Sequence, residues 1–266
     1  NRTKITKLDI PAYQTGPEGQ DANKAFYIRE GETFGVMYGS VFLKSLEQLA
    51  KQIDLMPGES VNDYEVNSDG YVIPKGTAGT VDEKPVKMLD ANGNVLYTKI
   101  GNSNPDFKLG FSTTLNYKGW GLYMLFDWKQ GGQIYNKTAQ WLTRDNRNAI
   151  MDQFGKAQED KKTVDYYQAF YDINDFNDFW VEDAGYVKLR ELSLSYTFNK
   201  DILKSVSGKL IRDAKLSLVG RNLLTFTKYS GYDPEVGTTD GSQIYAYDFM
   251  GYPNFRSYSV SLELKF

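Results

Sequence analysis

The chain has 266 residues and a formal net charge of −3, and it contains neither cysteine nor histidine. The charge gives no basic surface for nucleic acid, so no nucleic-acid partner is expected. The missing residue types exclude disulfide bonds, thiolate metal sites and a histidine general base within this chain. Aromatic residues make up 15% of it, which is typical of proteins rich in β-strands.

The first part of the chain carries only weak strand signals. Residues 25–30 and 33–42 are candidate strands joined across Gly31. Residues 44–90 contain frequent Gly, Pro, Asp and Asn, and this composition predicts a long, insertion-like loop. No apolar run approaches the ~18 residues of a membrane helix, but the strands of a membrane barrel need to be apolar on one face only.

Five later segments alternate apolar and polar residues, which is the pattern of strands with one apolar face. They are residues 107–118, 120–128, 191–198, 214–218 and 258–266. The last segment alternates up to Phe266, as the closing strand of an outer-membrane barrel does. The residues expected to face the membrane are Trp120, Leu122, Met124, Phe126, Trp128, Leu192, Leu194, Tyr196, Val260, Leu262, Leu264 and Phe266.

The opposite positions of the same strands are mostly polar. Charged residues there could line a substrate path, or could contact water or a plug within a wet lumen, and both interpretations stay open. These charged residues are Lys108, Lys118, Asp127, Lys129, Glu191, Lys215 and Glu263.

The connections between the strands alternate in length. Only Lys118 and Gly119 separate the first two, whereas residues 131–185 and 227–256 form long connections. Outer-membrane barrels have short periplasmic turns and long extracellular loops, and the alternation matches that arrangement. The strand from Trp120 to Trp128 would measure ~26 Å at ~3.3 Å per residue, which is longer than a usual strand of a soluble sandwich. The membrane interpretation is therefore favoured.

The long connections hold the candidate ligand-binding residues. Residues 137–154 could form a short helix, and residues 165–180 are crowded with aromatic side chains. Such rings could stack on sugars or on peptide side chains, or could pack the loop against its neighbours, and both interpretations stay open. The candidate substrate-binding residues are Trp141, Tyr166, Tyr167, Phe179 and Trp180.

Residues 90–94, Asp-Ala-Asn-Gly-Asn, place oxygen-bearing side chains at alternate positions, as a calcium loop does. A turn explains the same residues, because Asn-Gly readily adopts positive φ. Val95 stands where a second glycine would be, and Gly101 stands where a closing acid would be. The turn is favoured, so we expect no cofactor or metal, with Ca²⁺ as the alternative.

A further group of motifs lies toward the end of the chain. Residues 219–229 read Val-Gly-Arg-Asn-Leu-Leu-Thr-Phe-Thr-Lys-Tyr, and residues 231–235 read Gly-Tyr-Asp-Pro-Glu. Residues 90–105, 182–198 and 252–266 carry further motifs of the same kind. Taken in their order along the chain, all these segments resemble the SusC/RagA-type TonB-dependent outer-membrane transporters of Bacteroidetes-like bacteria. The resemblance covers most of the chain from about Gly31 onward and is weakest over residues 44–89.

The resemblance implies an all-β fold, in which residues 1–266 form the C-terminal part of a transmembrane antiparallel β-barrel. A complete member has a barrel of 22 strands around an N-terminal plug, and this chain offers no plug candidate. With the connection lengths, the resemblance places residues 44–106, 131–185 and 227–256 in extracellular loops. The implied location is the cell outer membrane, and the strand that closes the barrel is expected upstream.

The function implied by the resemblance is TonB-dependent active import of a nutrient, without catalysis. An oligosaccharide is the first candidate substrate and a peptide the second. The implied partners are a SusD-like surface lipoprotein, outer-membrane lipid, and the TonB complex through the absent N-terminal part. Two alternatives stay open. A passive porin or structural barrel would have no plug, and a soluble carbohydrate-binding β-sandwich would bury the face of Leu262 and Phe266.

Overall fold

The computed structural model describes residues 3–15, 25–172, 175–207, 210–236, 246–252 and 254–266. The chain divides into two compact units. Unit 1 comprises residues 1–104, 133–183 and 235–251, and unit 2 comprises residues 105–132, 184–234 and 252–266. Among the described residues, no helix has the length and apolar character needed to cross a membrane.

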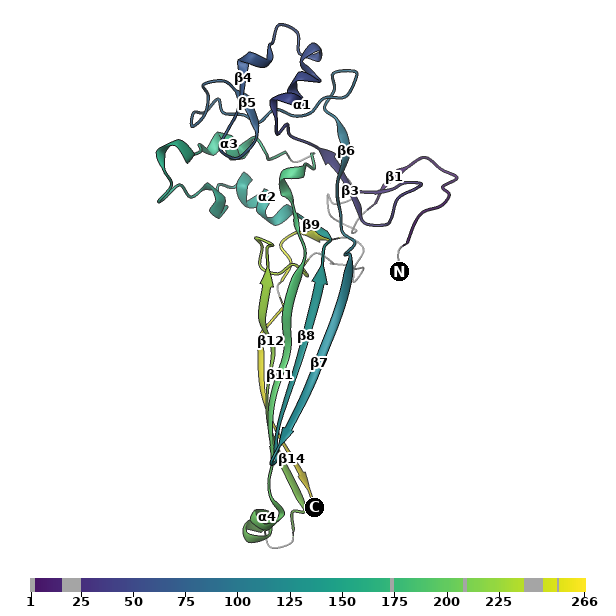
Figure 1. The fold of residues 1–266 in the computed structure, drawn as a ribbon, viewed down its shortest axis with the longest axis vertical. Coiled ribbons are helices and arrows are strands. Elements are labelled where there is room, and N and C mark those ends of the chain that lie inside the picture. The colour runs from purple at the N-terminus through teal and green to yellow at the C-terminus, as the bar shows by residue number, and fades with distance from the viewer. Residues whose placement is uncertain (1–2, 16–24, 173–174, 208–209, 237–245, 253) are drawn as a thin grey trace. The chain divides into compact units, whose positions relative to one another are not determined.

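Unit 2 is built on one antiparallel sheet of five long strands (Figure 1). Their order in the sheet is β14-β12-β11-β8-β7. They contain nine to fifteen residues each, and they correspond to the five alternating segments of the sequence, so this prediction is confirmed. The strands are β7 (Phe107–Tyr117), β8 (Trp120–Gln130), β11 (Tyr186–Thr197), β12 (Asp213–Thr227) and β14 (Ser257–Lys265).

The hairpin of β7 and β8 turns on Lys118 and Gly119. Their φ angles are +47° and +89°, and a two-residue hairpin turn whose twist matches the strands needs positive φ at both positions. A Cβ on Gly119 would lie 2.8 Å from the carbonyl oxygen of Thr197, so glycine also fits the close approach of β11. The turn pairs Tyr117 with Trp120 and thereby sets the register of the whole hairpin.

Strand β11 carries an irregularity at Arg190. Its pairing with both neighbours shifts between Leu189 and Glu191. At the same height of β12, Asn222 has a φ of +52°. A bulge re-aims the side chain of the extra residue. Here it directs the Arg190 guanidinium to Asp127, with 2.6 Å between the nitrogen and the carboxylate oxygen.

The connection from β11 to β12 contains α4 (Lys200–Ser207), a helix that the sequence patterns did not indicate. Asn199 caps its start, because the Asn199 side chain accepts a hydrogen bond of 3.0 Å from the N–H of Asp201. Figure 1 shows α4 beyond the end of the sheet at which the C-terminus lies.

Unit 1 contains smaller sheets in its described residues. A four-stranded sheet has the order β1-β2-β3-β6, a three-stranded sheet has the order β10-β9-β13, and β4 pairs with β5. The weak strand signals of residues 25–30 and 33–42 correspond to β2 and β3. The strands are β1 (Tyr13–Thr15), β2 (Phe26–Ile28), β3 (Val36–Ser40), β4 (Tyr64–Val66), β5 (Val72–Pro74), β6 (Tyr97–Asn102), β9 (Gln133–Asn136), β10 (Val181–Asp183) and β13 (Tyr247–Asp248).

The helices of unit 1 are short, and side chains cap several of them. Ser45, Asn136 and Thr163 each accept a hydrogen bond from a backbone N–H of the first turn that follows. The helix expected within residues 137–154 is present as α2. The α-helices are α1 (Leu46–Ala50), α2 (Lys137–Arg144) and α3 (Val164–Gln168). The 3-10 helices are η2 (Ile53–Leu55), η3 (Val61–Asp63), η4 (Ala149–Met151), η5 (Gln158–Asp160) and η6 (Asp178–Trp180).

Aromatic rings form the larger core of unit 1. Its buried members come from segments far apart in the sequence: Ala25, Phe26, Met37, Phe42, Tyr135, Tyr166, Tyr167, Phe170, Phe176, Trp180 and Tyr247. The Phe170 ring centroid lies 4.9 Å from that of Phe42 and 3.8 Å from that of Phe179. Because large rings bury much apolar area, these contacts supply the main favourable term that holds the irregular segments together.

Candidate functional site

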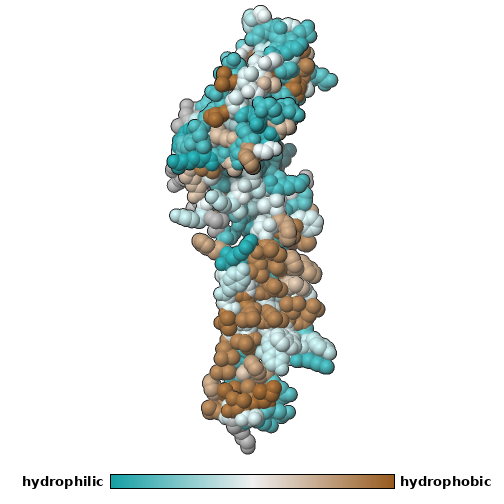
Figure 2. All heavy atoms as spheres, turned by 90° about the vertical axis from the view of Figure 1, so that its left-hand side faces the viewer, coloured by the Kyte–Doolittle hydropathy of each residue, from teal (hydrophilic) through white to brown (hydrophobic). Residues whose placement is uncertain are grey.

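The apolar positions of unit 2 form one continuous surface across five strands. The register places the apolar side chains of adjacent strands side by side in rows that cross the sheet. One row consists of Leu115, Leu122, Leu194, Leu218 and Val260. The next row consists of Tyr117, Trp120, Tyr196, Leu216 and Leu262. Figure 2 shows hydrophobic side chains gathered over the long strands.

This apolar face is exposed. The side chains of Leu262 and Phe266 are 59% and 69% exposed. A β-sandwich would bury this face against a second sheet, so the structure contradicts the sandwich alternative. Apolar residues scattered singly over a soluble surface are ordinary, whereas a contiguous face of this extent marks contact with a partner or a membrane.

Aromatic residues stand at both ends of the apolar face. At one end the rings of Trp120 and Tyr196 lie 4.9 Å apart, and Tyr117 pairs with Trp120 in register. At the other end the rings of Phe107 and Trp128 lie 5.0 Å apart, edge to face. Transmembrane barrels carry such aromatic girdles where the apolar band meets the two interfaces, so the sheet has the layout of a barrel wall.

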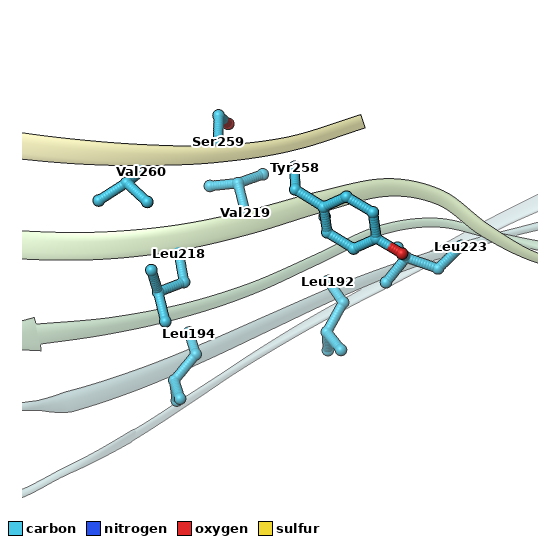
Figure 3. Close-up of a pocket in the computed structure, with 9 residues that line it drawn as sticks. Leu192, Leu194, Leu218, Val219, Leu223, Tyr258, Ser259 and Val260 are labelled. Carbon is cyan, nitrogen blue, oxygen red and sulfur yellow. The ribbon is translucent and has the colours of Figure 1, made fainter. Parts of the chain in front are cut away.

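A shallow hollow of about 370 Å³ interrupts the apolar face (Figure 3). It lies beside Gly220, over which the Leu223 side chain leans, so that a Cβ at this glycine would lie 2.9 Å from Leu223 Cδ2. Leu192, Tyr258 and Val260 contribute to its walls. Because the walls are largely apolar, the hollow suits hydrocarbon better than a polar substrate.

Charged residues pair with one another on the opposite, polar face of the sheet. Arg190 lies against Asp127, as described above, and Arg221 Nε lies 2.9 Å from Glu191 Oε2. Two of the charged residues expected on the wet face therefore have cationic partners within the same sheet. These exposed and half-exposed pairs contribute little to stability in water, but they fix the direction of the arginine forks.

A buried ion pair on the polar face was not indicated by the sequence. Lys188 Nζ lies 2.6 Å from Asp233 Oδ1, and both side chains are almost fully buried. Asn254 also donates a hydrogen bond of 3.3 Å to the other oxygen of Asp233. The pair ties the Gly-Tyr-Asp-Pro-Glu segment after β12 to β11. The sequence shows only that Asp233 precedes a proline, as in a turn, and its spacing along the chain does not identify Lys188 as its partner.

The structure divides the five candidate ligand-binding aromatic residues, all of which lie in unit 1. Tyr166, Tyr167 and Trp180 belong to the buried core. The indole N–H of Trp180 donates a hydrogen bond of 2.8 Å to the carbonyl oxygen of Phe170. Of the two interpretations, packing within the protein fits these three rings, because neighbouring protein atoms surround them.

The other two candidates, Trp141 and Phe179, are half-buried. The Trp141 ring has the Arg144 guanidinium carbon 4.1 Å from its centroid and the Phe249 ring edge-on at 4.9 Å. Phe179 stacks on Phe170 with one face. Both keep part of their surface open, so ligand contact by these two rings stays a prediction.

A buried polar network lies beside the aromatic core. Glu83 Oε1 accepts hydrogen bonds of 2.6 Å from Lys162 Nζ and 2.8 Å from Asn67 Nδ2. The Tyr166 hydroxyl donates a hydrogen bond of 2.7 Å to Asp69 Oδ2. Burial, and then the hydrogen bond to Asp69, raise the pKa of Tyr166 above its ordinary range. The network fastens the β4–β5 region to the segment that leads into α3.

Residues 90–94 form a turn. Asp90 Oδ1 accepts hydrogen bonds from the N–H groups of Asn92, at 2.8 Å, and Asn94, at 3.0 Å. Gly93 has a φ of +80°, as this turn requires. Asp90 is thus engaged by its own backbone. Across the described ranges, no group of three or more His, Cys, Asp or Glu side chains could hold a metal ion.

Comparisons with known proteins agree with this architecture. No family model matches the chain. Two proteins of Formosa agariphila match along all of it: TonB-dependent receptor P3 at 29% identity and TonB-dependent receptor P39 at 26% identity. The chain covers 26% and 28% of these proteins, so it spans about a quarter of their length.

Solved structures of the RagAB peptide importer match the fold. The match to the open-open state covers the whole chain, with a TM-score of 0.59 and 21% sequence identity. The match to the closed-closed state covers 99% of the chain, with a TM-score of 0.58 and 20% sequence identity. Each match covers 26% of the RagAB chain concerned. The five-stranded sheet with its exposed apolar face is therefore part of a membrane β-barrel. Along its whole length the chain is similar to TonB-dependent receptors, and its fold is similar to that of RagAB.

Proposed function

We propose that the full protein imports a nutrient actively across the outer membrane, with energy supplied through TonB. The observation that carries the proposal is the apolar face of the five-stranded sheet, continuous over five strands and bounded by aromatic residues at both ends. This segment then forms barrel wall rather than a catalytic site. The matching relatives are named TonB-dependent receptors, which supports the same role.

The barrel wall has a definite orientation in this proposal. Lipid contacts the twelve apolar residues of β8, β11 and the C-terminal segment 258–266 that the alternation of the sequence selects, from Trp120 to Phe266. The two-residue turn at Lys118 and Gly119 lies on the periplasmic side, since barrels keep their short turns there. Residues 44–106, 131–185 and 227–256 then lie on the extracellular side, where substrate arrives.

We propose an oligosaccharide as the first candidate substrate and a short peptide as the second. RagAB, whose fold is similar, is described as a peptide importer, and this description supports the second candidate. The open parts of Trp141 and Phe179 can stack on a sugar ring or on a peptide side chain. Substitution of Trp141 by Ala should lower uptake, whereas Phe154→Ala, at a residue of unit 1 that is 95% exposed, should leave it unchanged.

The partners of the proposed importer lie outside this segment. A SusD-like surface lipoprotein would cover the extracellular loops, and TonB would act on a plug encoded elsewhere in the protein. The resemblance of the sequence motifs to SusC/RagA-type transporters supports the lipoprotein partner.

The experiment that tests the function is uptake in cells. A strain that lacks the full receptor is supplied with labelled oligosaccharides and peptides, with and without TonB. We expect uptake of one class to require both the receptor and TonB. Receptor-dependent uptake that persists without TonB would favour the passive porin, and unchanged uptake in the strain that lacks the receptor would refute a transport role.

A further inference from the structure

Helix α4 carries apolar side chains that the described residues leave exposed. Ile202 is 50% exposed, Val206 is 81% exposed, and Leu210, which follows the helix, is 68% exposed. Ile202 and Val206 are four residues apart and therefore lie one above the other on the same side of the helix. Leu203 is the buried residue of the helix.

The other side of α4 is polar and cationic. Lys200, Lys204 and Ser205 are exposed, and with Asp201 they lie on the side of the helix away from Val206. Two lysines against one acid give the helix a net positive charge. An amphipathic helix of this kind, with lysines on its polar side, has the composition of a segment that lies in a membrane interface.

The position of α4 agrees with that environment. Tyr196 belongs to the aromatic row at one end of the apolar face, and its ring lies 5.2 Å from that of Phe198. Only residues 197–199 separate Tyr196 from the helix. Three residues reach at most ~10 Å at ~3.3 Å each. The headgroup region on each side of a bilayer is roughly 5–8 Å thick, so α4 begins within it or at its edge.

We propose that α4 lies in the headgroup layer of the periplasmic phospholipid leaflet. This inference rests on the proposed lipid contact of the apolar face, and the short turn of β7 and β8 at the same end of the sheet selects the leaflet. Ile202 and Val206 enter the boundary of the acyl chains, while Lys200 and Lys204 extend to lipid phosphates. The helix thus adds an interfacial anchor at one rim of the barrel wall, beside the aromatic rings that the strands place there.

Site-directed fluorescence tests the proposal in the intact receptor. These 266 residues contain no cysteine, so one introduced cysteine is the labelling site of this segment once any cysteines elsewhere in the receptor are replaced by serine. The variants Val206→Cys and Lys204→Cys carry a polarity-sensitive probe on the two sides of α4, and Leu194→Cys carries it on the apolar face. Each protein is reconstituted in vesicles of phosphatidylethanolamine and phosphatidylglycerol that contain phospholipids spin-labelled either near the headgroup or near the acyl end.

The expected pattern separates this inference from the proposed function. The probe at position 206 should be quenched several-fold more by the headgroup-proximal label than the probe at 204, and the probe at 194 should respond to the deep label. If position 194 is quenched while 206 behaves like 204, the helix faces water or protein and the proposal for α4 fails alone. If position 194 is not quenched, the lipid-facing assignment of the sheet fails as well.

Discussion

Lys162 and Glu83 are almost completely enclosed in unit 1, with 1% and 0% of their side chains exposed. Neither charge can turn to water when its partner is removed. Glu83→Gln should therefore destabilise unit 1 by about 3–5 kcal/mol, the usual cost of leaving one buried charge unpaired. The measurement is denaturant unfolding of the purified receptor, followed by tryptophan fluorescence.

The control for this prediction removes both charges. The double variant Glu83→Gln with Lys162→Met keeps the approximate volume and leaves no ion, so it should recover much of the loss. If the single and double variants unfold at the same denaturant concentration, the ion pair is not the source of the effect.

Two glycines offer a second test at the scale of single residues. A Cβ on Gly39 in β3 would lie 2.1 Å from the carbonyl oxygen of Phe176, whereas a Cβ on Gly110 in β7 would meet nothing within 4 Å. Gly39→Ala should cost about 1–3 kcal/mol or more through overpacking. Gly110→Ala should be neutral or slightly stabilising, since glycine weakens a strand interior. Thermal unfolding of the two variants decides, and equal melting temperatures would contradict the prediction.

At the scale of elements, the strands of unit 2 have two faces with different tolerances. Leu192 lies in the middle row of the apolar face, next to Met124 in register, and Ser193 points to the polar face. Lysine at position 192 should cost roughly 2–4 kcal/mol, as a cation at the bilayer midplane does, and the cost should fall near the rim. Folding into lipid vesicles, monitored by protease resistance, measures it.

The matched variants for this prediction are Ser193→Lys and Trp120→Lys. The first places the same charge on the polar face and should fold normally. The second places it at the end of the apolar face and should cost far less than position 192. A cost that does not depend on face or on depth would argue against a membrane wall.

The strands of unit 2 could be predicted from the sequence, whereas most strands and helices of unit 1 could not. Alternation marks a strand with one apolar face, because side chains change sides at every residue. Helix α4 was not predicted, although Asn199 is a typical helix N-cap and Ile202 and Val206 have helical spacing. In unit 1 the strands are short and lack alternation, so their pairing depends on distant partners.

At the scale of the whole molecule, alkaline pH should lower the stability of the folded state through unit 1. Burial raises the pKa of Tyr71, Tyr135 and Tyr166 above the ordinary value of 10.0. Above pH 10 the unfolded chain loses these protons while the folded unit keeps them, so stability present below that pH declines as pH rises further. Tyrosinate absorbance and unfolding midpoints measured across this range test the prediction, and a midpoint that stays constant would contradict it.

The two kinds of candidate site, the apolar face and the ligand-binding aromatic residues, differ in how far the sequence predicts them. The exposed apolar face could be predicted because it repeats a two-residue pattern over five strands. The ligand-binding aromatic residues could not be sorted, because Tyr166 and Trp180 are buried by residues as distant as Phe26 and Tyr247. Local sequence says that a ring is present, and only the fold says whether its face is open.

The sequence by itself determined the strands of the sheet, their two faces and the tight turn at Lys118 and Gly119, because each follows from local periodicity or local backbone preference. The tertiary structure decided which charges pair, as Lys188 does with Asp233 and Lys162 with Glu83. It also decided which aromatic rings are core, and it showed the apolar side of α4. These outcomes depend on contacts between distant segments, which no local pattern records.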